Sequence, residues 1–132
     1  MKYLLIVLIL LANMAVQAQT KETCRVALVQ AHLAWGDVDA NLEAFQKRVE
    51  KCQGCDMIVF PELFVSGCEM KKKDKEVAVQ TKDEIAGYYP VVIEKMKEWA
   101  AGSGALMIGS TIYKEEEKFY NRLLAVFPDG HY

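Results

Sequence analysis

Short apolar runs along the chain predict strands that other parts of the protein cover. Residues 26–29 are continuously apolar, as in a strand that is buried on both faces. Residues 58–60 form a second run, which ends at Pro61 because proline has no N–H to donate to a sheet. Residues 105–112 and 119–127 predict a third and a fourth strand.

Apolar residues spaced by three and four positions predict two helices between these strands. Asp37 or Asp39 can cap the first helix, which is expected to run to about Cys52. Its apolar stripe consists of Val38, Leu42, Phe45, Val49 and Cys52. The second helix is expected to start near Pro90, a residue favoured in the first turn, and to end at residues 102–104. Its stripe consists of Val92, Met96, Trp99 and Ala100.

The segments between these elements are polar and predict loops and turns. Residues 70–87 are charged and irregular, with a lysine run between residues 71 and 75, and they predict a solvated loop. Residues 115–118 predict the turn of an antiparallel hairpin, and residues 128–130 predict a further turn. The order strand, helix, strand, helix, strand, strand indicates an α/β layered protein.

The candidate catalytic residue is Glu62, which directly follows Pro61 at the carboxyl end of the second strand. Open α/β folds keep their ligand sites at this edge of the sheet. The neighbouring Leu63, Phe64 and Val65 predict apolar surroundings, and burial of a carboxylic acid raises its pKa from about 4.3 towards neutrality. A carboxylate tuned in this way can act as a general acid and base. The spacing alone also fits an ordinary glutamate in a strand-to-loop turn.

The block V-F-P-E-L-F-V-S-G at residues 59–67 resembles the glutamate motif of the nitrilase (carbon–nitrogen hydrolase) superfamily. Other blocks of the chain also resemble segments of that family, and they occur in the same order along the sequence. They are R-V-A-L-V-Q at residues 25–30, W-G-D-V-D-A-N at 35–41, G-S at 109–110, Y-N-R-L at 120–123 and P-D-G at 128–130. The resemblance covers residues 24–132 and is greatest to the ω-amidase branch, in the motifs W-x-D, P-E-x-F-x-S-G-x-x-M and Y-N-R-L.

The resemblance implies a four-layer α-β-β-α sandwich, of which residues 19–132 form the amino-terminal part. Enzymes of this family use a Glu–Lys–Cys triad without a metal or an organic cofactor, and Glu62 occupies the glutamate position. The lysine is expected a few residues beyond the P-D-G turn, and the cysteine later still. The chain to Tyr132 is therefore expected to be truncated and inactive alone. Cys68 is no substitute, because it lies too close in sequence to Glu62 to reach across an active site.

The activity implied by this resemblance is the hydrolysis of non-peptide C–N bonds, with release of ammonia from small 2-oxo-acid amides. A homodimer is implied when the chain is complete. One alternative is an exported non-catalytic domain on the same scaffold, which has lost the triad. Another is an exported dithiol redox protein that uses Cys52 and Cys55.

Residues 1–18 predict a secretory signal peptide and hence export to the periplasm or the extracellular space. Lys2 precedes an apolar run at residues 3–12, and V-Q-A at 16–18 provides a small-residue cleavage site. The run is short for a membrane span, which takes about 20 apolar residues, although an uncleaved anchor or a buried helix is the alternative. The formal net charge of −2 argues against nucleic acid or an anionic membrane as a partner.

The cysteines are expected to be structural or incidental. Four of them follow the predicted signal peptide, at Cys24, Cys52, Cys55 and Cys68, and an even count permits disulfides in an oxidising compartment. The lone C-x-x-C at residues 52–55 lacks the further ligands that a zinc site needs. It closes a helix, whereas a thioredoxin-like redox motif opens one. Whether Cys52 and Cys55 form a disulfide stays open.

Overall fold

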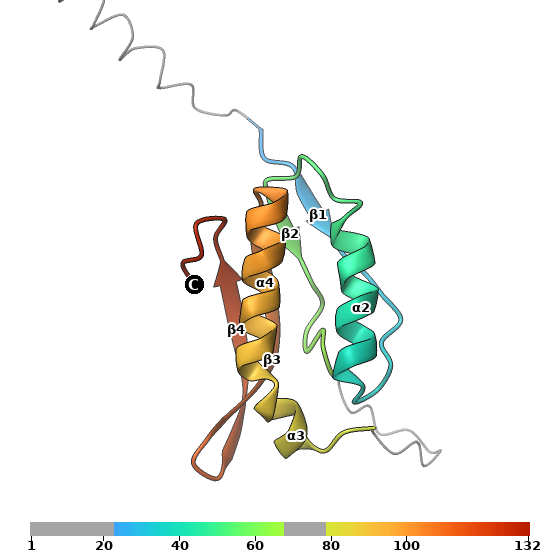
Figure 1. Cartoon of the computed structure of the whole chain (residues 1–132), viewed down its shortest axis with the longest axis vertical. Coiled ribbons are helices and arrows are strands. Elements are labelled where there is room, and N and C mark those ends of the chain that lie inside the picture. Colours follow the sequence, from blue (N-terminus) through green and yellow to red (C-terminus); the bar gives the residue numbers. More distant parts are fainter. Residues whose placement is uncertain (1–22, 68–78) are drawn as a thin grey trace, which may run out of the picture.

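The computed structural model of the chain describes residues 23–67 and 79–132 (Figure 1). The predicted signal peptide and the lysine run at 71–75 lie outside the described residues. The elements of the described part are β1 (Val26–Leu28), α2 (Val38–Val49), β2 (Met57–Val59), α3 (Lys82–Gly87), α4 (Tyr89–Ser103), β3 (Leu106–Glu115) and β4 (Lys118–Val126). None of these helices is long and apolar enough to cross a membrane.

The four strands form one mixed sheet in the order β1-β2-β3-β4. The first two pairs are parallel, with Ala27 opposite Ile58 and Ile58 opposite Met107. Strands β3 and β4 form the predicted antiparallel hairpin, with Met107 opposite Val126. The hairpin is longer than its apolar run indicated, because polar residues continue the pairing as far as Glu115 and Lys118.

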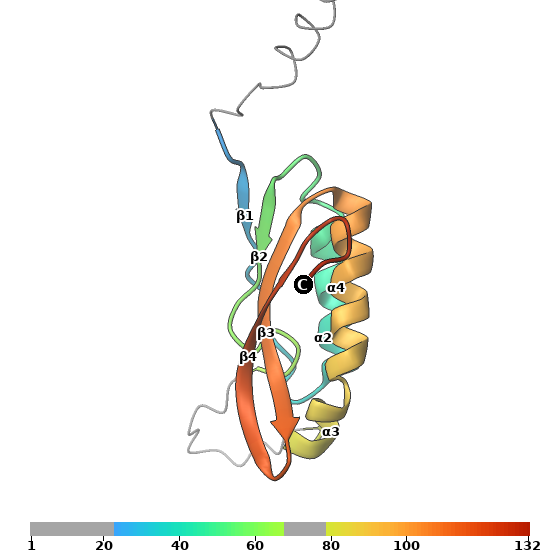
Figure 2. The same cartoon turned by 90° about the vertical axis from the view of Figure 1, so that its left-hand side faces the viewer.

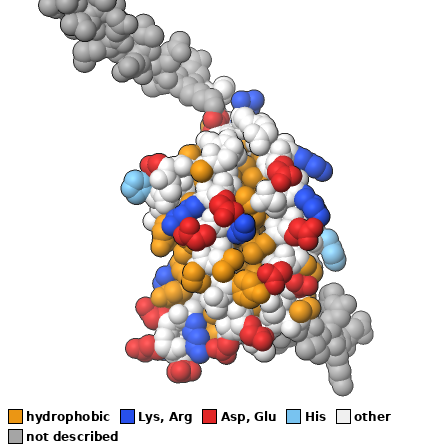
Figure 3. All heavy atoms as spheres, in the orientation of Figure 1, with side chains coloured by type: hydrophobic (Ala, Val, Ile, Leu, Met, Phe, Trp, Pro, Cys, Tyr) orange, Lys and Arg blue, Asp and Glu red, His pale blue; other side chains and the backbone are white. Residues whose placement is uncertain are grey.

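Helices α2 and α4 cover one face of this sheet and leave the other face open within the described part of the chain (Figure 2). Fully buried side chains fill the space between helices and sheet, among them Phe45 and Val38 from α2, Met96 from α4 and Ile58 from β2. The helical stripes therefore face the sheet, as their spacing predicted. Acidic and basic side chains are interspersed on the outer face of the helices (Figure 3).

The starts of the two long helices and the end of α4 follow from local chemistry, as the sequence predicted, whereas α2 ends at Val49, before the expected Cys52. Asp37 is the N-cap of α2, and its carboxylate accepts a hydrogen bond from the backbone N–H of Ala40 at 3.0 Å. Pro90 lies in the first turn of α4. This helix ends at Gly104, whose φ of 69° lies in the left-handed region that glycine adopts without steric cost.

The prediction of a loop over residues 70–87 is wrong for its last part, because α3 occupies Lys82–Gly87. A capping box starts this helix: the Thr81 hydroxyl accepts from the backbone of Glu84, and the Glu84 carboxylate accepts from the backbone of Thr81 at 2.7 Å. The side chain of Ile85 is buried, and Asp83 pairs with Lys114 of β3 at 2.7 Å, so both contacts join the short helix to the rest of the protein.

Large apolar side chains are exposed on the uncovered face of the sheet. Val26 and Leu28 alternate with the inward-facing Ala27 on β1, and their side chains are 48% and 73% exposed. Leu123 on β4 is 70% exposed and lies opposite Ser110 in the register. An apolar sheet face of this kind is characteristic of a sheet that is half of a larger layered structure.

Candidate functional site

Glu62 lies in the turn that follows β2, at the edge of the sheet where the sequence predicted a site. Its side chain is exposed and borders a shallow pocket on the uncovered face of the sheet. The pocket is lined by Val59, Phe60, Pro61, Glu62, Ile108, Gly109, Ser110, Asn121 and Leu123.

The expectation that Leu63, Phe64 and Val65 surround Glu62 with apolar side chains is wrong. Phe64 and Val65 are fully buried in the core, on the side of the sheet that the helices cover. The backbone turns at Leu63, whose φ of 48° is unusual for a residue with a side chain. This turn sends the apolar side chains inward and leaves the Glu62 carboxylate on the open side.

Strand β3 holds this turn in place through Ser110. The Ser110 hydroxyl accepts a hydrogen bond from the backbone N–H of Leu63 at 2.9 Å, and the Ser110 carbonyl accepts one from Phe64 at 3.2 Å. Just before the turn, the backbone N–H of Phe60 donates to the carbonyl of Ile108 at 2.8 Å. The backbone on both sides of Glu62 is therefore fixed to one strand, which supports the strained conformation of Leu63.

Gly109 permits the close approach between this turn and β3. A Cβ atom at this position would lie 2.9 Å from the ring of Phe64 and 3.1 Å from that of Phe60. These two rings stack on each other at 4.7 Å, and the ring of Phe45 meets both edge to face. Since such a packed ring cluster cannot easily move aside, glycine is the residue that fits here.

The buried amide of Asn41 ties the same turn to helix α2. Its Nδ2 donates to the carbonyls of Val65 at 2.9 Å and Ala34 at 2.7 Å, and its Oδ1 accepts from the N–H of Ala34 at 2.9 Å. The residue is only 1% exposed, and its amide satisfies the buried carbonyl of Val65 and two partly buried backbone groups of Ala34.

The carboxylate of Glu62 has one side-chain partner in the described structure, Asn121 on β4. The Asn121 Nδ2 donates to Glu62 Oε1 at 2.6 Å, although the two residues are 59 positions apart in the chain. Sequence reasoning placed Asn41, Ser110 and Asn121 inside the resembling blocks but gave none of them a role. The signal that could have identified them is the presence of a polar residue in an otherwise apolar or strand-forming segment.

The cysteines in the described structure do not form a second reactive site. Cys24, Cys52 and Cys55 are free thiols, and Cys68 lies outside the described residues. Burial raises the pKa of the Cys52 thiol above its ordinary value, and the neighbouring Cys55 raises it further. Reactive thiols have a lowered pKa, so this environment does not favour the dithiol redox alternative.

No group of three or more His, Cys, Asp and Glu side chains suited to a metal occurs in residues 23–67 and 79–132.

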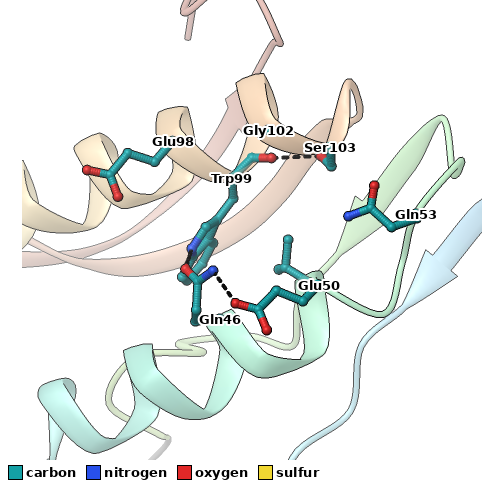
Figure 4. Close-up of a pocket in the computed structure, with 8 residues that line it drawn as sticks. Gln46, Glu50, Gln53, Glu98, Trp99, Gly102 and Ser103 are labelled. Atoms are coloured by element: carbon teal, nitrogen blue, oxygen red, sulfur yellow. Dashed lines mark hydrogen bonds between the residues drawn. The ribbon is translucent and has the colours of Figure 1, made fainter.

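A second hollow lies between α2 and α4, on the opposite side of the sheet from Glu62 (Figure 4). Its polar side chains bond one another: Gln46 donates to Glu50 at 2.8 Å and accepts from the indole N–H of Trp99. The Ser103 hydroxyl donates to the Trp99 carbonyl at 2.7 Å. These contacts join the two helices and satisfy the groups involved, so the Glu62 pocket remains the candidate site.

Comparisons with known proteins identify the family of this chain. The family model for carbon–nitrogen hydrolases matches residues 25–132. Omega-amidase YafV of Yersinia enterocolitica is 32% identical over 108 residues, which are 82% of this chain and 38% of that protein. The Escherichia coli K12 protein of the same name is 33% identical over 106 residues, 80% of this chain and 38% of its own length. The chain thus spans 38% of the curated relatives that it matches.

Solved structures show the same architecture. A CN-hydrolase superfamily protein of Xanthomonas campestris superposes with a TM-score of 0.70 at 27% identity, over 84% of this chain and 39% of that one. Nit3 of Saccharomyces cerevisiae, from branch 10 of the nitrilase superfamily, gives a TM-score of 0.60 at 22% identity, over 82% and 41%. The sheet and its helices therefore have the fold of the amino-terminal part of the nitrilase-like α-β-β-α sandwich. With its fold and the family match taken together, the chain belongs to the carbon–nitrogen hydrolase family.

Proposed function

We propose that the full-length protein is a thiol hydrolase of non-peptide C–N bonds in which Glu62 is the general base and acid. The observation that carries the proposal is the placement of the Glu62 carboxylate. It lies on the open face of the sheet, at the carboxyl end of β2, in a turn that β3 and the core hold rigidly. A carboxylate held in this way can meet a nucleophile that approaches from another layer.

In the proposed reaction, Glu62 takes the proton of a cysteine thiol as the sulfur attacks the amide carbonyl. The carboxylic acid then gives this proton to the departing nitrogen, the C–N bond breaks, and ammonia leaves a thioester behind. Glu62 next takes a proton from water, which attacks the thioester, and returns that proton to the released thiolate. We propose that a cysteine and an oxyanion-stabilising lysine of the full-length protein complete the triad with Glu62, and we expect residues 1–132 alone to be inactive.

We further propose that the substrate is a small amide that carries a carboxylate and a 2-oxo group, such as 2-oxoglutaramate. The support is the similarity to the two omega-amidases and the ω-amidase form of the motifs at residues 35–37 and 66–70. The relatives are matched over 38% of their length, so the proposal concerns the full-length protein.

Ammonia release by the purified full-length protein tests both parts of this proposal. We expect the highest kcat/KM for 2-oxoglutaramate, compared with simple aliphatic amides, N-carbamoyl amino acids and nitriles. A carbamoyl compound or a nitrile as the best substrate contradicts the ω-amidase assignment and leaves the thiol-hydrolase class intact. No hydrolysis of any compound favours the non-catalytic scaffold instead.

We also propose that the protein is exported and that cleavage after Ala18 leaves Gln19 at the amino terminus. Intact-mass measurement of the protein from its exporting host checks this expectation directly. As a control, Ala18→Arg removes the small residue that the cleavage site needs, and the variant should keep residues 1–18. A wild-type mass that includes residues 1–18 identifies a retained segment and contradicts the proposal.

A further inference from the structure

The hydrogen bond between Asn121 and Glu62 joins the candidate catalytic group to the strand farthest from it in the sheet order. Glu62 follows β2, whereas Asn121 lies on β4, with β3 between the two strands. An ionised carboxylate only accepts hydrogen bonds, so the amide N–H₂ of Asn121 is the group that faces it. The Nδ2···Oε1 distance of 2.6 Å makes this a direct hydrogen bond, with no water between the two groups.

The two neighbouring strands fix different parts of the same turn. Ser110 on β3 binds the backbone of Leu63, which sets where the turn lies. Asn121 on β4 binds the carboxylate itself, which sets the direction in which the acid points. The backbone anchor leaves the side-chain torsions of Glu62 free, so Ser110 cannot replace Asn121 in this role.

The other residues that line the pocket offer the carboxylate little else. Apart from Glu62, Ser110 and Asn121 are the polar side chains among the described lining residues, and the Ser110 hydroxyl accepts from Leu63 and makes no hydrogen bond to Glu62 in the described structure. The amide of Asn121 is also uncharged, so it can orient Glu62 without locking it as a permanent ion pair. A group that must gain and lose a proton in one turnover needs such a partner.

We propose that Asn121 is the positioning residue of the acid–base group: it aims the Glu62 carboxylate at the reacting thiol and at the departing nitrogen. The inference rests on the proposed function. Misplacement of a catalytic group by about 1 Å can cost roughly 10²-fold in rate, so the alignment of one carboxylate affects turnover strongly. The proposed role of Asn121 is to align the acid–base group, so we expect the effect on kcat.

The test compares substitutions at Asn121 in the full-length protein. Asn121→Leu keeps the approximate size but removes the donor, and we expect kcat to fall by about 10- to 100-fold while KM changes less than about threefold. Asn121→Asp places a second carboxylate against Glu62 and should lower kcat at least as far. Asn121→His retains an N–H near the same place and should restore kcat to within about fivefold of the wild type.

Phe119→Ala is the matched control, because Phe119 lies two positions before Asn121 on β4, is 40% exposed and does not line the pocket. We expect its kcat to stay within about threefold of the wild type. Equal losses in Phe119→Ala and Asn121→Leu indicate a general disturbance of strand β4 and overturn the inference. A normal kcat in Asn121→Leu, or no rescue by histidine, overturns it as well.

A crystal structure of the full-length Asn121→Leu variant provides a readout that does not depend on activity. We expect the backbone of residues 60–64 to keep its position, because Ser110 still holds it, while the Glu62 carboxylate loses its single orientation. An unchanged Glu62 carboxylate overturns the positioning role even if the protein is an active amidase. If the wild type hydrolyses none of the amides, the proposed function fails, and this structure still decides whether Asn121 positions Glu62.

Discussion

Glu62→Gln is expected to lower the turnover of the full-length protein by about 10²- to 10⁴-fold. Glutamine keeps the length of the side chain and can still accept the hydrogen bond from Asn121 through its Oε1. It cannot take a proton from a thiol or return one to ammonia, so the loss should fall on kcat and leave KM nearly unchanged. The measurement is steady-state ammonia release with the best amide substrate.

The folding of this variant should be intact, because Glu62 is exposed and its turn is held by backbone contacts with Ser110. Glu43→Gln is the control: it removes an exposed carboxylate from α2, where Glu43 bonds Lys47 far from the pocket. Its turnover should match that of the wild type. Wild-type turnover in Glu62→Gln makes Glu62 an ordinary turn residue and removes the basis of the proposed mechanism.

The strands and long helices could be predicted because each carries its own periodic signal. The stripe that contains Phe45 and Val49 faces the sheet, and Asp37 caps its helix, since both effects depend on residues within one or two turns. Helix α3 also carried a local signal, the T-x-x-E pattern at residues 81–84. The charged residues around this pattern favoured a loop, but Ile85 of α3 is buried and Asp83 pairs with Lys114 on β3.

The surroundings of Glu62 could not be predicted in the same way. The sequence placed the residue correctly at the end of its strand, but the direction of the following side chains depends on the turn at Leu63. That turn exists because Ser110, 47 positions away, supplies the hydrogen bond that holds it. The contact with Asn121 depends further on the register of β4, where a slip of one residue would send the amide to the other face.

Asn41→Leu is expected to destabilise the protein by about 3 kcal/mol. The substitution keeps a side chain of similar size but removes three hydrogen bonds to the backbone of Ala34 and Val65. The Val65 carbonyl stays buried beside a residue that is 1% exposed, the two Ala34 groups are partly buried, and each buried polar group left without a partner costs about 1–3 kcal/mol. The backbone around Ala34 can move towards water, so we expect the total loss to lie near the lower end of the summed cost of these three groups. The measurement is the midpoint of urea unfolding of the full-length protein.

Asn121→Leu is the matched control for stability, since it makes the same chemical change at an exposed position with one hydrogen bond. Its unfolding free energy should change by less than about 0.5 kcal/mol, because water can solvate the carboxylate that loses its partner. Comparing the two variants therefore shows how much of the lost unfolding free energy comes from the burial of the amide. If Asn41→Leu lowers the unfolding free energy no more than Asn121→Leu does, water reaches the backbone around Val65. The turn that carries Glu62 is then less rigid than its hydrogen bonds indicate.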